Sequence, residues 1–280
     1  MSTEKIVGRF APSPTGPLHF GSLSCALASY LDVRNLGGKW LVRIEDIDPP
    51  REIKGASSRI LSQLEDHGLY WDDKVLFQST RLDAYQNSLD ILKQHNLAYH
   101  CECSRQRVNS LEGIYDNRCR PSHLPSTNNA TRLQLNQPHQ LVEFVDKIAG
   151  RHVQSLIEDV GDFVIRRRDN LFSYQLAVTV DDQYQNVTHV MRGSDLLDST
   201  PRQIYLQHLP ADQLPTCAPP MDFLMDTLPF MELIQTILLG DGNCAEYEWR
   251  FIFNFAEWAF LFFIGLVVYN LYFFFFRKNV

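Results

Sequence analysis

The sequence predicts an α/β fold built around a parallel sheet, and its first 44 residues carry the clearest signal. Residues 5–10 have the character of a short strand, and a loop rich in proline and glycine follows at 11–17. Residues 20–35 are expected to form a helix, and residues 39–44 alternate as a second strand does. Strand, loop, helix and strand in this order form one βαβ unit, which places two parallel strands side by side.

The expected helix at 20–35 has small residues on one face and leucines spaced by four at Leu23, Leu27 and Leu31, and Gly37-Gly38 ends it. Two further amphipathic helices are expected at 53–67 and 81–95, and residues 99–125 have the composition of a loop. Further along, the sequence predicts strands at 162–168, 174–181 and 187–190, and a helix at 201–209.

Composition is that of an ordinary globular protein: 45% of the 280 residues are hydrophobic and 21% are charged. The net charge of −7 excludes non-specific coating by nucleic acid, so an RNA contact would need a local basic patch. No apolar secretory segment occurs near Met1, which leads to the expectation of a cytoplasmic protein.

The loop between the first strand and the first helix is a candidate nucleotide site, with a plain proline-rich turn as the alternative. It reads Arg-Phe-Ala-Pro-Ser-Pro-Thr-Gly-Pro-Leu-His-Phe-Gly from Arg9 to Gly21. Free N–H groups and the macrodipole attract phosphates to helix N-termini, and glycines let the backbone approach a ligand closely. His19 can donate a hydrogen bond to a phosphate and stabilise charge that develops on it.

Three carboxylates follow the second strand, at Glu45, Asp46 and Asp48. Ligands of α/β proteins bind beyond the carboxyl ends of parallel strands, so a carboxylate here is suited to an ammonium group. An acidic loop that caps the next helix is the alternative.

A second group of polar residues lies between 172 and 197. Tyr174 supplies a hydroxyl, and Arg192 precedes Gly193 after a predicted strand, where its planar guanidinium could bind a carboxylate with two hydrogen bonds. The basic cluster at 166–168 is interpreted as a solvated strand face rather than as an RNA contact.

Cys101, Cys103 and Cys119 form a candidate zinc site. Zinc takes four ligands, so three thiolates need one more donor, for which His100 or His123 would be conventional. The spacing by itself also allows three ordinary cysteines.

These segments together resemble the glutamyl-type class I aminoacyl-tRNA synthetases, and within them the short glutamyl-queuosine tRNA(Asp) synthetases. The resemblance rests on the opening segment from Arg9 to Gly21 and on the Arg-Ile-Glu-Asp-Ile-Asp block from Arg43. It continues through the segments from Tyr174 to Asp182 and from Val190 to Leu197, and it ends near Pro210. It implies a Rossmann-like catalytic domain at 1–209 with a zinc-bearing insertion at about 96–160.

The resemblance also assigns roles to residues. It implies glutamate contacts at Arg9, Ser13, Glu45, Tyr174 and Arg192, with Glu45 on the α-amino group. It implies ATP binding by Pro12, Gly16, His19 and Gly21, of which His19 and Gly21 count as catalytic, and it brings Mg²⁺ with the ATP. It makes Tyr115 the fourth ligand of one structural Zn²⁺ beside Cys101, Cys103 and Cys119.

The character of the chain changes at residue 210. No lysine occurs between residues 148 and 277, so the Lys-x-Ser-Lys motif, whose lysine stabilises the departing pyrophosphate in class I synthetases, is missing. Ten of the 18 phenylalanines lie at 251–276, and 19 residues from Trp258 to Phe276 are almost wholly apolar. A frameshifted tail at 210–280 explains these features best, and a transmembrane anchor or a buried core helix at 251–276 are the alternatives.

The expected activity is that of a ligase-type synthetase. The enzyme is expected to be a monomer that uses ATP to activate glutamate in the absence of tRNA, and then to transfer the glutamate to queuosine in the anticodon arm of tRNA(Asp). DNA is not an expected partner, and a membrane is one only if the 251–276 segment is genuine. Alternatives are a fragment of a glutamyl-tRNA synthetase that charges a tRNA 3′ end, a non-catalytic membrane-tethered module that binds glutamate or ATP, and an inactive product of a damaged gene.

Overall fold

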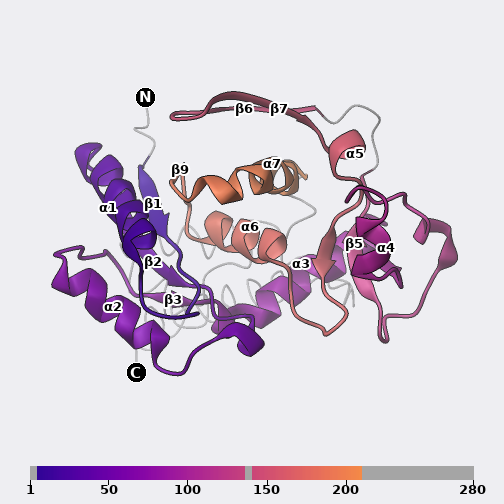
Figure 1. Cartoon of the computed structure of the whole chain (residues 1–280), viewed down its shortest axis with the longest axis horizontal. Coiled ribbons are helices and arrows are strands. Elements are labelled where there is room, and N and C mark those ends of the chain that lie inside the picture. The colour runs from indigo at the N-terminus through magenta and orange to yellow at the C-terminus, as the bar shows by residue number, and fades with distance from the viewer. Residues whose placement is uncertain (1–4, 136–140, 210–280) are drawn as a thin grey trace, which may run out of the picture. The chain divides into compact units, whose positions relative to one another are not determined.

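A four-stranded parallel sheet forms one half of the computed structural model, which describes residues 5–135 and 141–209 (Figure 1). The strand order is β3-β2-β1-β9, and every pair of neighbours is parallel. The strands are β1 (Val7–Phe10), β2 (Lys39–Ile44), β3 (Leu76–Phe77) and β9 (His189–Val190). The predicted parallel α/β sheet is therefore confirmed.

Helix α1 (Phe20–Asn35) connects β1 to β2, with the bounds that the sequence predicted. Its buried face is the small one, because Ala26, Ser29 and Val33 contact the sheet while Leu27 and Leu31 remain about half exposed. The approach is close: a β-carbon at Gly8 of β1 would lie 2.2 Å from Val33. Small residues on α1 thus let the helix lie directly on the strand.

Helices α2 (Ala56–Asp66) and α3 (Leu82–Gln94) begin and end inside the predicted ranges. Helix α7 (Thr200–His208) also lies where a helix was expected, and Pro201 stands in its first turn, where no hydrogen-bonding N–H is needed. Short 3-10 helices connect the larger elements at η1 (Pro49–Arg51), η2 (Gln78–Arg81), η3 (Arg120–Ser122) and η4 (Ser194–Ser199).

The strand predicted at 174–181 was wrong, because these residues form helix α6 (Tyr174–Tyr184). The Ser173 hydroxyl caps the helix by accepting a hydrogen bond from the N–H of Leu176 at 3.3 Å. Seven consecutive residues, 176–182, are buried, so α6 is enclosed on every side. A helix without an exposed face has no amphipathic period, and its β-branched residues made it resemble a buried strand.

The insertion between α3 and α6 is more regular than its composition indicated (Figure 1). An antiparallel sheet has the order β4-β5-β8, and β6 and β7 form a separate hairpin. Part of the expected loop at 99–125 is thus strand and helix. The elements are β4 (Ala98–Cys101), α4 (Arg105–Asn109), β5 (Ala130–Leu133), β6 (Leu141–Asp146), β7 (Gly150–Ser155), α5 (Leu156–Asp159) and β8 (Val164–Arg166).

Two buried carboxylates near the end of α6 connect the helix to the rest of the fold. Asp182 accepts hydrogen bonds from Arg9 of β1 at 3.1 Å and from Arg43 of β2 at 2.6 Å. Asp181 accepts from Arg81 Nε at 2.8 Å and from the Tyr85 hydroxyl at 2.6 Å. Although burial raises the pKa of Asp182, the guanidinium groups of Arg9 and Arg43 lower it below its usual value.

The predicted tail at 210–280, with its apolar segment at 251–276, lies outside the described residues. Within 5–135 and 141–209, no helix is both long enough and apolar enough to cross a bilayer.

Replacing Asp182 with asparagine should lower the free energy of unfolding by about 3 to 5 kcal/mol, because it leaves two buried guanidinium groups without a counter-charge. Urea unfolding followed by circular dichroism measures this loss. The control is Glu143→Gln, which breaks the exposed Glu143–Arg151 pair and should change the stability far less, because water screens an exposed ion pair. Equal losses in the two variants would contradict a structural role for Asp182.

Candidate functional site

A cavity of about 870 Å³ lies between the loop after β1, the end of β2, the start of α6 and the insertion. Ser13, Glu45 and Tyr174, all predicted glutamate contacts, line it. A volume of this size suits a ligand much larger than a free amino acid. The structure therefore brings three residues that are far apart in the sequence to one concave surface.

The loop after β1 is fixed to the end of β2. The carbonyl of Pro12 accepts a hydrogen bond from the N–H of Glu45 at 3.0 Å, and the carbonyl of Pro14 accepts from the N–H of Ile53 at 2.9 Å. These bonds hold Ser13 at the cavity wall, beside the C-terminal end of β2 and Glu45.

His19 stands at the exposed start of α1, away from the cavity wall. Its Nδ1 accepts a hydrogen bond from the N–H of Ser22 at 3.2 Å, and its Nε2 lies 2.9 Å from the Ser22 hydroxyl. The histidine thus caps the helix, and a β-carbon at Gly21 would come within 3.2 Å of its ring. Of the predicted ATP-binding residues, His19 and Gly21 lie at this helix start, and Pro12 and Gly16 lie in the loop before it.

Glu45 is a buried carboxylate on the cavity wall, 9% exposed. Burial raises its pKa to about 7, although Arg43 and Arg9 lower it, and Asp182 and Asp181 contribute a smaller increase. A cationic group in the cavity would favour the ionised carboxylate, so the site is suited to an ammonium ion.

Tyr174 and Arg192, two of the predicted glutamate contacts, are hydrogen-bonded to each other. Arg192 Nη1 donates to the Tyr174 hydroxyl at 3.2 Å and to Gln203 at 2.6 Å, and Nη2 donates to Thr200 at 2.7 Å. Arg192 does not line the cavity itself, but it orients the tyrosine that does.

The structure does not place Arg9, a predicted glutamate contact, where it could touch a ligand in the cavity. It is 2% exposed, it does not line the cavity, and its Nε donates to Asp182. Three further arginines line the cavity, Arg105, Arg132 and Arg202, and none of them was predicted as a site residue. Arg202 follows a proline at the start of a predicted helix, and that position was the signal that could have directed attention to it.

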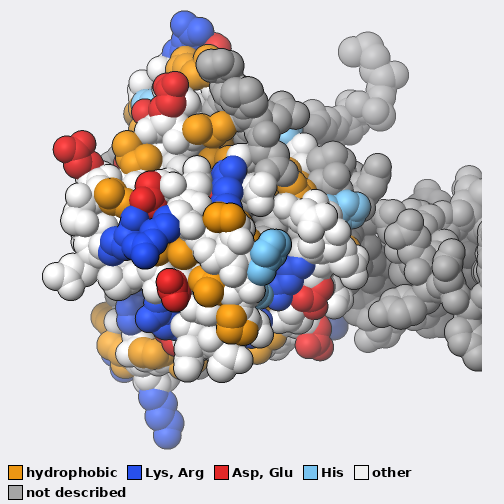
Figure 2. Space-filling model, turned by 90° about the vertical axis from the view of Figure 1, so that its right-hand side faces the viewer, with side chains coloured by type: hydrophobic (Ala, Val, Ile, Leu, Met, Phe, Trp, Pro, Cys, Tyr) orange, Lys and Arg blue, Asp and Glu red, His pale blue; other side chains and the backbone are white. Residues whose placement is uncertain are grey.

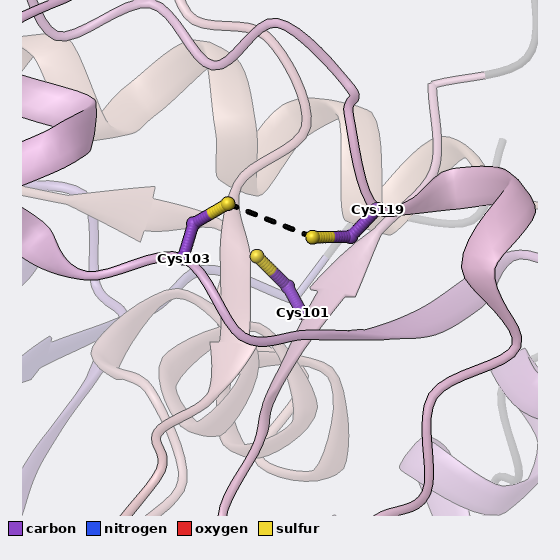
Figure 3. A group of neighbouring side chains, drawn as sticks. All are labelled: Cys101, Cys103 and Cys119. Carbon is purple, nitrogen blue, oxygen red and sulfur yellow. Dashed lines mark hydrogen bonds between the residues drawn. The ribbon is translucent and has the colours of Figure 1, made fainter.

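Cys101, Cys103 and Cys119 come together in the insertion, and their three sulfur atoms point toward one another (Figure 3). Their sulfur atoms lie within 4.8 Å of one another, and Cys103 Sγ is 3.5 Å from Cys119 Sγ. Such a group could hold a metal ion.

Tyr115 completes this cluster. Its hydroxyl lies 3.3 Å from Cys101 Sγ and 3.8 Å from Cys103 Sγ, and it accepts a hydrogen bond from the N–H of Cys119 at 3.0 Å. Arg132 lies over the tyrosine ring at 3.7 Å and donates to Cys101 Sγ at 3.2 Å.

The two histidines considered as a fourth ligand lie elsewhere. Among the described residues, the group that could hold a metal ion contains neither His100 nor His123. His100 instead contacts the Thr131 hydroxyl through Nδ1 at 3.3 Å, and His123 is exposed.

Comparison with known proteins identifies the class to which this sheet, cavity and thiol cluster belong. A family model described as tRNA synthetases class I (E and Q), catalytic domain, matches residues 5–217. The chain belongs to this family, which confirms the resemblance seen in the sequence.

Within this family, the chain is similar in sequence to proteins that share one name. The chain is 55% identical over 203 residues to a glutamyl-Q tRNA(Asp) synthetase of Yersinia pseudotuberculosis, covering 72% of this chain and 60% of that protein. It is 51% identical over 208 residues to a protein of the same name from Pseudomonas fluorescens, covering 74% and 69%. The chain thus spans about 60 to 69% of the length of these relatives.

A solved structure agrees with the fold. The glutamate tRNA ligase from Elizabethkingia meningosepticum, in complex with its amino acid, superposes with a TM-score of 0.64 at 28% identity. The match covers 72% of this chain and 46% of that one.

A second family model, described as disulfide bond formation protein DsbB, matches residues 199–273. It overlaps the synthetase match at 199–217. The tail thus matches a different family model from the rest of the chain. Its origin in a shifted reading frame stays a prediction, which sequencing the gene in independent isolates would check.

Replacing Glu45 with glutamine should make the free energy of unfolding less dependent on pH. The folded carboxyl group takes up a proton below about pH 7, whereas the unfolded one does so near 4.5. Ionisation of Glu45 therefore destabilises the fold as pH rises from 4.5 through 7, by about 3 kcal/mol at 1.36 kcal/mol per pH unit.

Urea unfolding of the wild-type chain and of Glu45→Gln between pH 5 and 8 tests this dependence. The stability of the wild type relative to the variant should fall across the range, whereas Glu143→Gln on the exposed hairpin should show no such trend. A constant difference between wild type and Glu45→Gln would contradict a raised pKa of Glu45.

Proposed function

We propose that this chain activates glutamate with ATP and transfers it to queuosine in the anticodon arm of tRNA(Asp). The observation that carries the proposal is the buried Glu45 carboxylate on the wall of a large cavity, facing the same space as Ser13 and Tyr174. The 51 to 55% identity to relatives named glutamyl-Q tRNA(Asp) synthetase supports this acceptor over a tRNA 3′ end.

Glu45 would bind the α-ammonium group of glutamate. Burial raises the pKa of Glu45 to about 7, and a cation bound beside the carboxylate would lower this pKa again. Glu45 would then be ionised in the complex. Tyr174 would donate a hydrogen bond from its hydroxyl to the substrate, while Arg192 orients that hydroxyl by donating to its oxygen. Ser13 would contact the substrate from the opposite loop.

Activation would join the α-carboxylate of glutamate to the α-phosphate of ATP and release pyrophosphate. The protein needs no covalent intermediate; it needs two substrates aligned for in-line attack. His19, with Gly21 and the loop residues Pro12 and Gly16, would hold the ATP phosphates at the start of α1, toward which the helix dipole directs positive charge. Magnesium would accompany the ATP and neutralise part of its charge.

Transfer would then join the glutamyl group to queuosine and release AMP. We infer that the first step is slow, because no lysine lies between residues 148 and 277 to stabilise the departing pyrophosphate. A missing charge of this kind costs several kcal/mol, or about a hundred-fold or more in rate.

We also propose that the thiol cluster holds one structural Zn²⁺. Three sulfurs and the Tyr115 oxygen supply four donors around one point, the number that zinc takes in structural sites. A bound zinc ion would hold β4 and the segment around Cys119 together in a region that has little apolar core of its own.

Glutamate-dependent exchange between ATP and labelled pyrophosphate, without tRNA, tests the activation step, and calorimetry measures glutamate binding alongside it. Glutamate should bind, and exchange should be slower than in a relative that has the lysine motif. Glu45→Gln should weaken glutamate binding by at least about tenfold, since it removes a charged partner, and Glu143→Gln should leave it unchanged. A wild-type chain that binds no glutamate would contradict the proposal.

Metal analysis of the purified chain should find about one zinc per molecule, and chelation should lower the thermal midpoint. Cys103→Ser should abolish the bound zinc, whereas Cys25→Ser, outside the cluster, should retain it. Tyr115→Phe should bind zinc more weakly than the wild type; an unchanged affinity would remove the tyrosine from the ligand set.

A further inference from the structure

The cavity wall carries arginines that have no carboxylate within ion-pair distance. Within the described residues, Arg105, Arg168 and Arg202 line the cavity, and none of them lies within 4.0 Å of a carboxylate. Arg168 donates only to the backbone carbonyl of Glu102, and Arg105 has no hydrogen-bonding partner in the part of the chain that the structure describes.

Two other arginines of the same cavity are neutralised. Arg51 pairs with Asp48 at 2.5 Å, and Arg167 pairs with Asp48 at 3.2 Å and with Asp169 at 2.5 Å. The fold therefore supplies carboxylates along this wall, yet Arg105, Arg168 and Arg202 do not receive one. Arg132 also lacks one, but it is buried and donates to Cys101 Sγ and to the backbone carbonyl of Asp162.

Arg202 is the most informative of the three because it is partly buried. Its Nε is buried and lacks a partner among the described residues, and burial lowers its pKa although Asp198 raises it. A buried guanidinium nitrogen without a hydrogen-bond acceptor is unfavourable unless an anion or another acceptor approaches it. The arrangement points to a ligand that brings negative charge into the cavity.

The ligand has to present several anionic groups at separate points. Arg105 comes from α4, Arg168 follows β8 and Arg202 belongs to α7. The proposed ATP phosphates lie at the start of α1, whose His19 and Gly21 do not line this wall. A nucleic-acid backbone carries one phosphate per nucleotide, and arginine binds phosphate with two hydrogen bonds.

We propose that Arg105, Arg168 and Arg202 bind backbone phosphates of the RNA acceptor, so that the nucleotide that receives glutamate reaches into the cavity toward Glu45 and Tyr174. This inference rests on the proposed function for the identity of the acceptor. It revises the interpretation of residues 166–168 as a solvated strand face: Arg167 and Arg168 follow β8 and line the cavity.

The basic side chains on the surface around the insertion are distributed in a way that suits an RNA bound at a few points. Figure 2 shows this face, where basic side chains gather in groups between acidic and hydrophobic ones and do not form one continuous sheet of charge. With a net charge of −7, the chain would attract RNA only through such local groups.

Binding of a labelled tRNA(Asp) anticodon stem-loop to the full chain, measured by fluorescence anisotropy between about 50 and 200 mM salt, tests the inference. Arg105→Gln, Arg168→Gln and Arg202→Gln should each weaken binding severalfold. Each should also reduce the slope of log affinity against log salt by about 0.7 to 1, because one phosphate contact is lost.

The matched control is Arg59→Gln, which removes an exposed arginine on α2 outside the cavity and should change neither quantity. Arg105→Lys and Arg202→Lys keep the charge and should retain most of the salt dependence, which separates charge from folding. Wild-type affinity and slope in all three glutamine variants, or an equal loss in Arg59→Gln, would overturn the inference.

Glutamate binding by the same variants separates this inference from the proposed function. Arg105→Gln and Arg168→Gln should bind glutamate as the wild type does. If glutamate binds and RNA binding ignores the three arginines, the RNA surface is refuted and the glutamate site stands. If RNA binding depends on them but no glutamate binds, the RNA surface stands and the proposed function fails. A loss of glutamate binding alone in Arg202→Gln would move Arg202 to the amino-acid site.

Discussion

The carboxylate of Asp182, held between Arg9 and Arg43, is the interaction on which the arrangement of the fold depends. Arg9 belongs to β1 and Arg43 to β2, so a single side chain of α6 joins both central strands of the parallel sheet. Asp181 makes the corresponding connection to Arg81 and Tyr85. Buried charges are tolerated only when they are paired, and here the pairing fixes the end of α6.

The other end of the same helix carries Tyr174, on the cavity wall. Because α6 is rigid and enclosed, the position of its last turn determines where its first turn presents the tyrosine hydroxyl. The site is thus positioned by residues that do not touch it. Arg9 illustrates the distinction: in this structure it supports the sheet and does not face the cavity.

Much of the first half of the fold could be predicted because its signals are local. The bounds of α1 and β2 follow from periodicity and from Gly37-Gly38, and the chemistry of Glu45 follows from its place after a strand. Helix α6 could not be predicted from a pattern, since burial on every side removes the polar face that marks a helix. The interpretation of Cys101, Cys103, Tyr115 and Cys119 as one group needed a family resemblance, because spacing alone does not select a tyrosine.

Features that depend on pairing across the chain could not be read from the sequence. Asp182 and Arg9 are 173 positions apart, and nothing local indicates that they meet. The same holds for Arg105 and Arg202, whose lack of acidic partners appears only when the whole cavity wall is assembled. The expectations for residues 210–280 concern a segment beyond the described residues, and two family models overlap where that segment begins, at 199–217.

The hydrogen bond from Arg168 to the carbonyl of Glu102 has a consequence of its own. Glu102 is the single residue between Cys101 and Cys103, so the arginine holds the backbone at the point where both thiols leave it. One peptide unit therefore separates the thiol cluster from a guanidinium group of the cavity wall. A metal ion held by the two cysteines would also fix the carbonyl that orients Arg168.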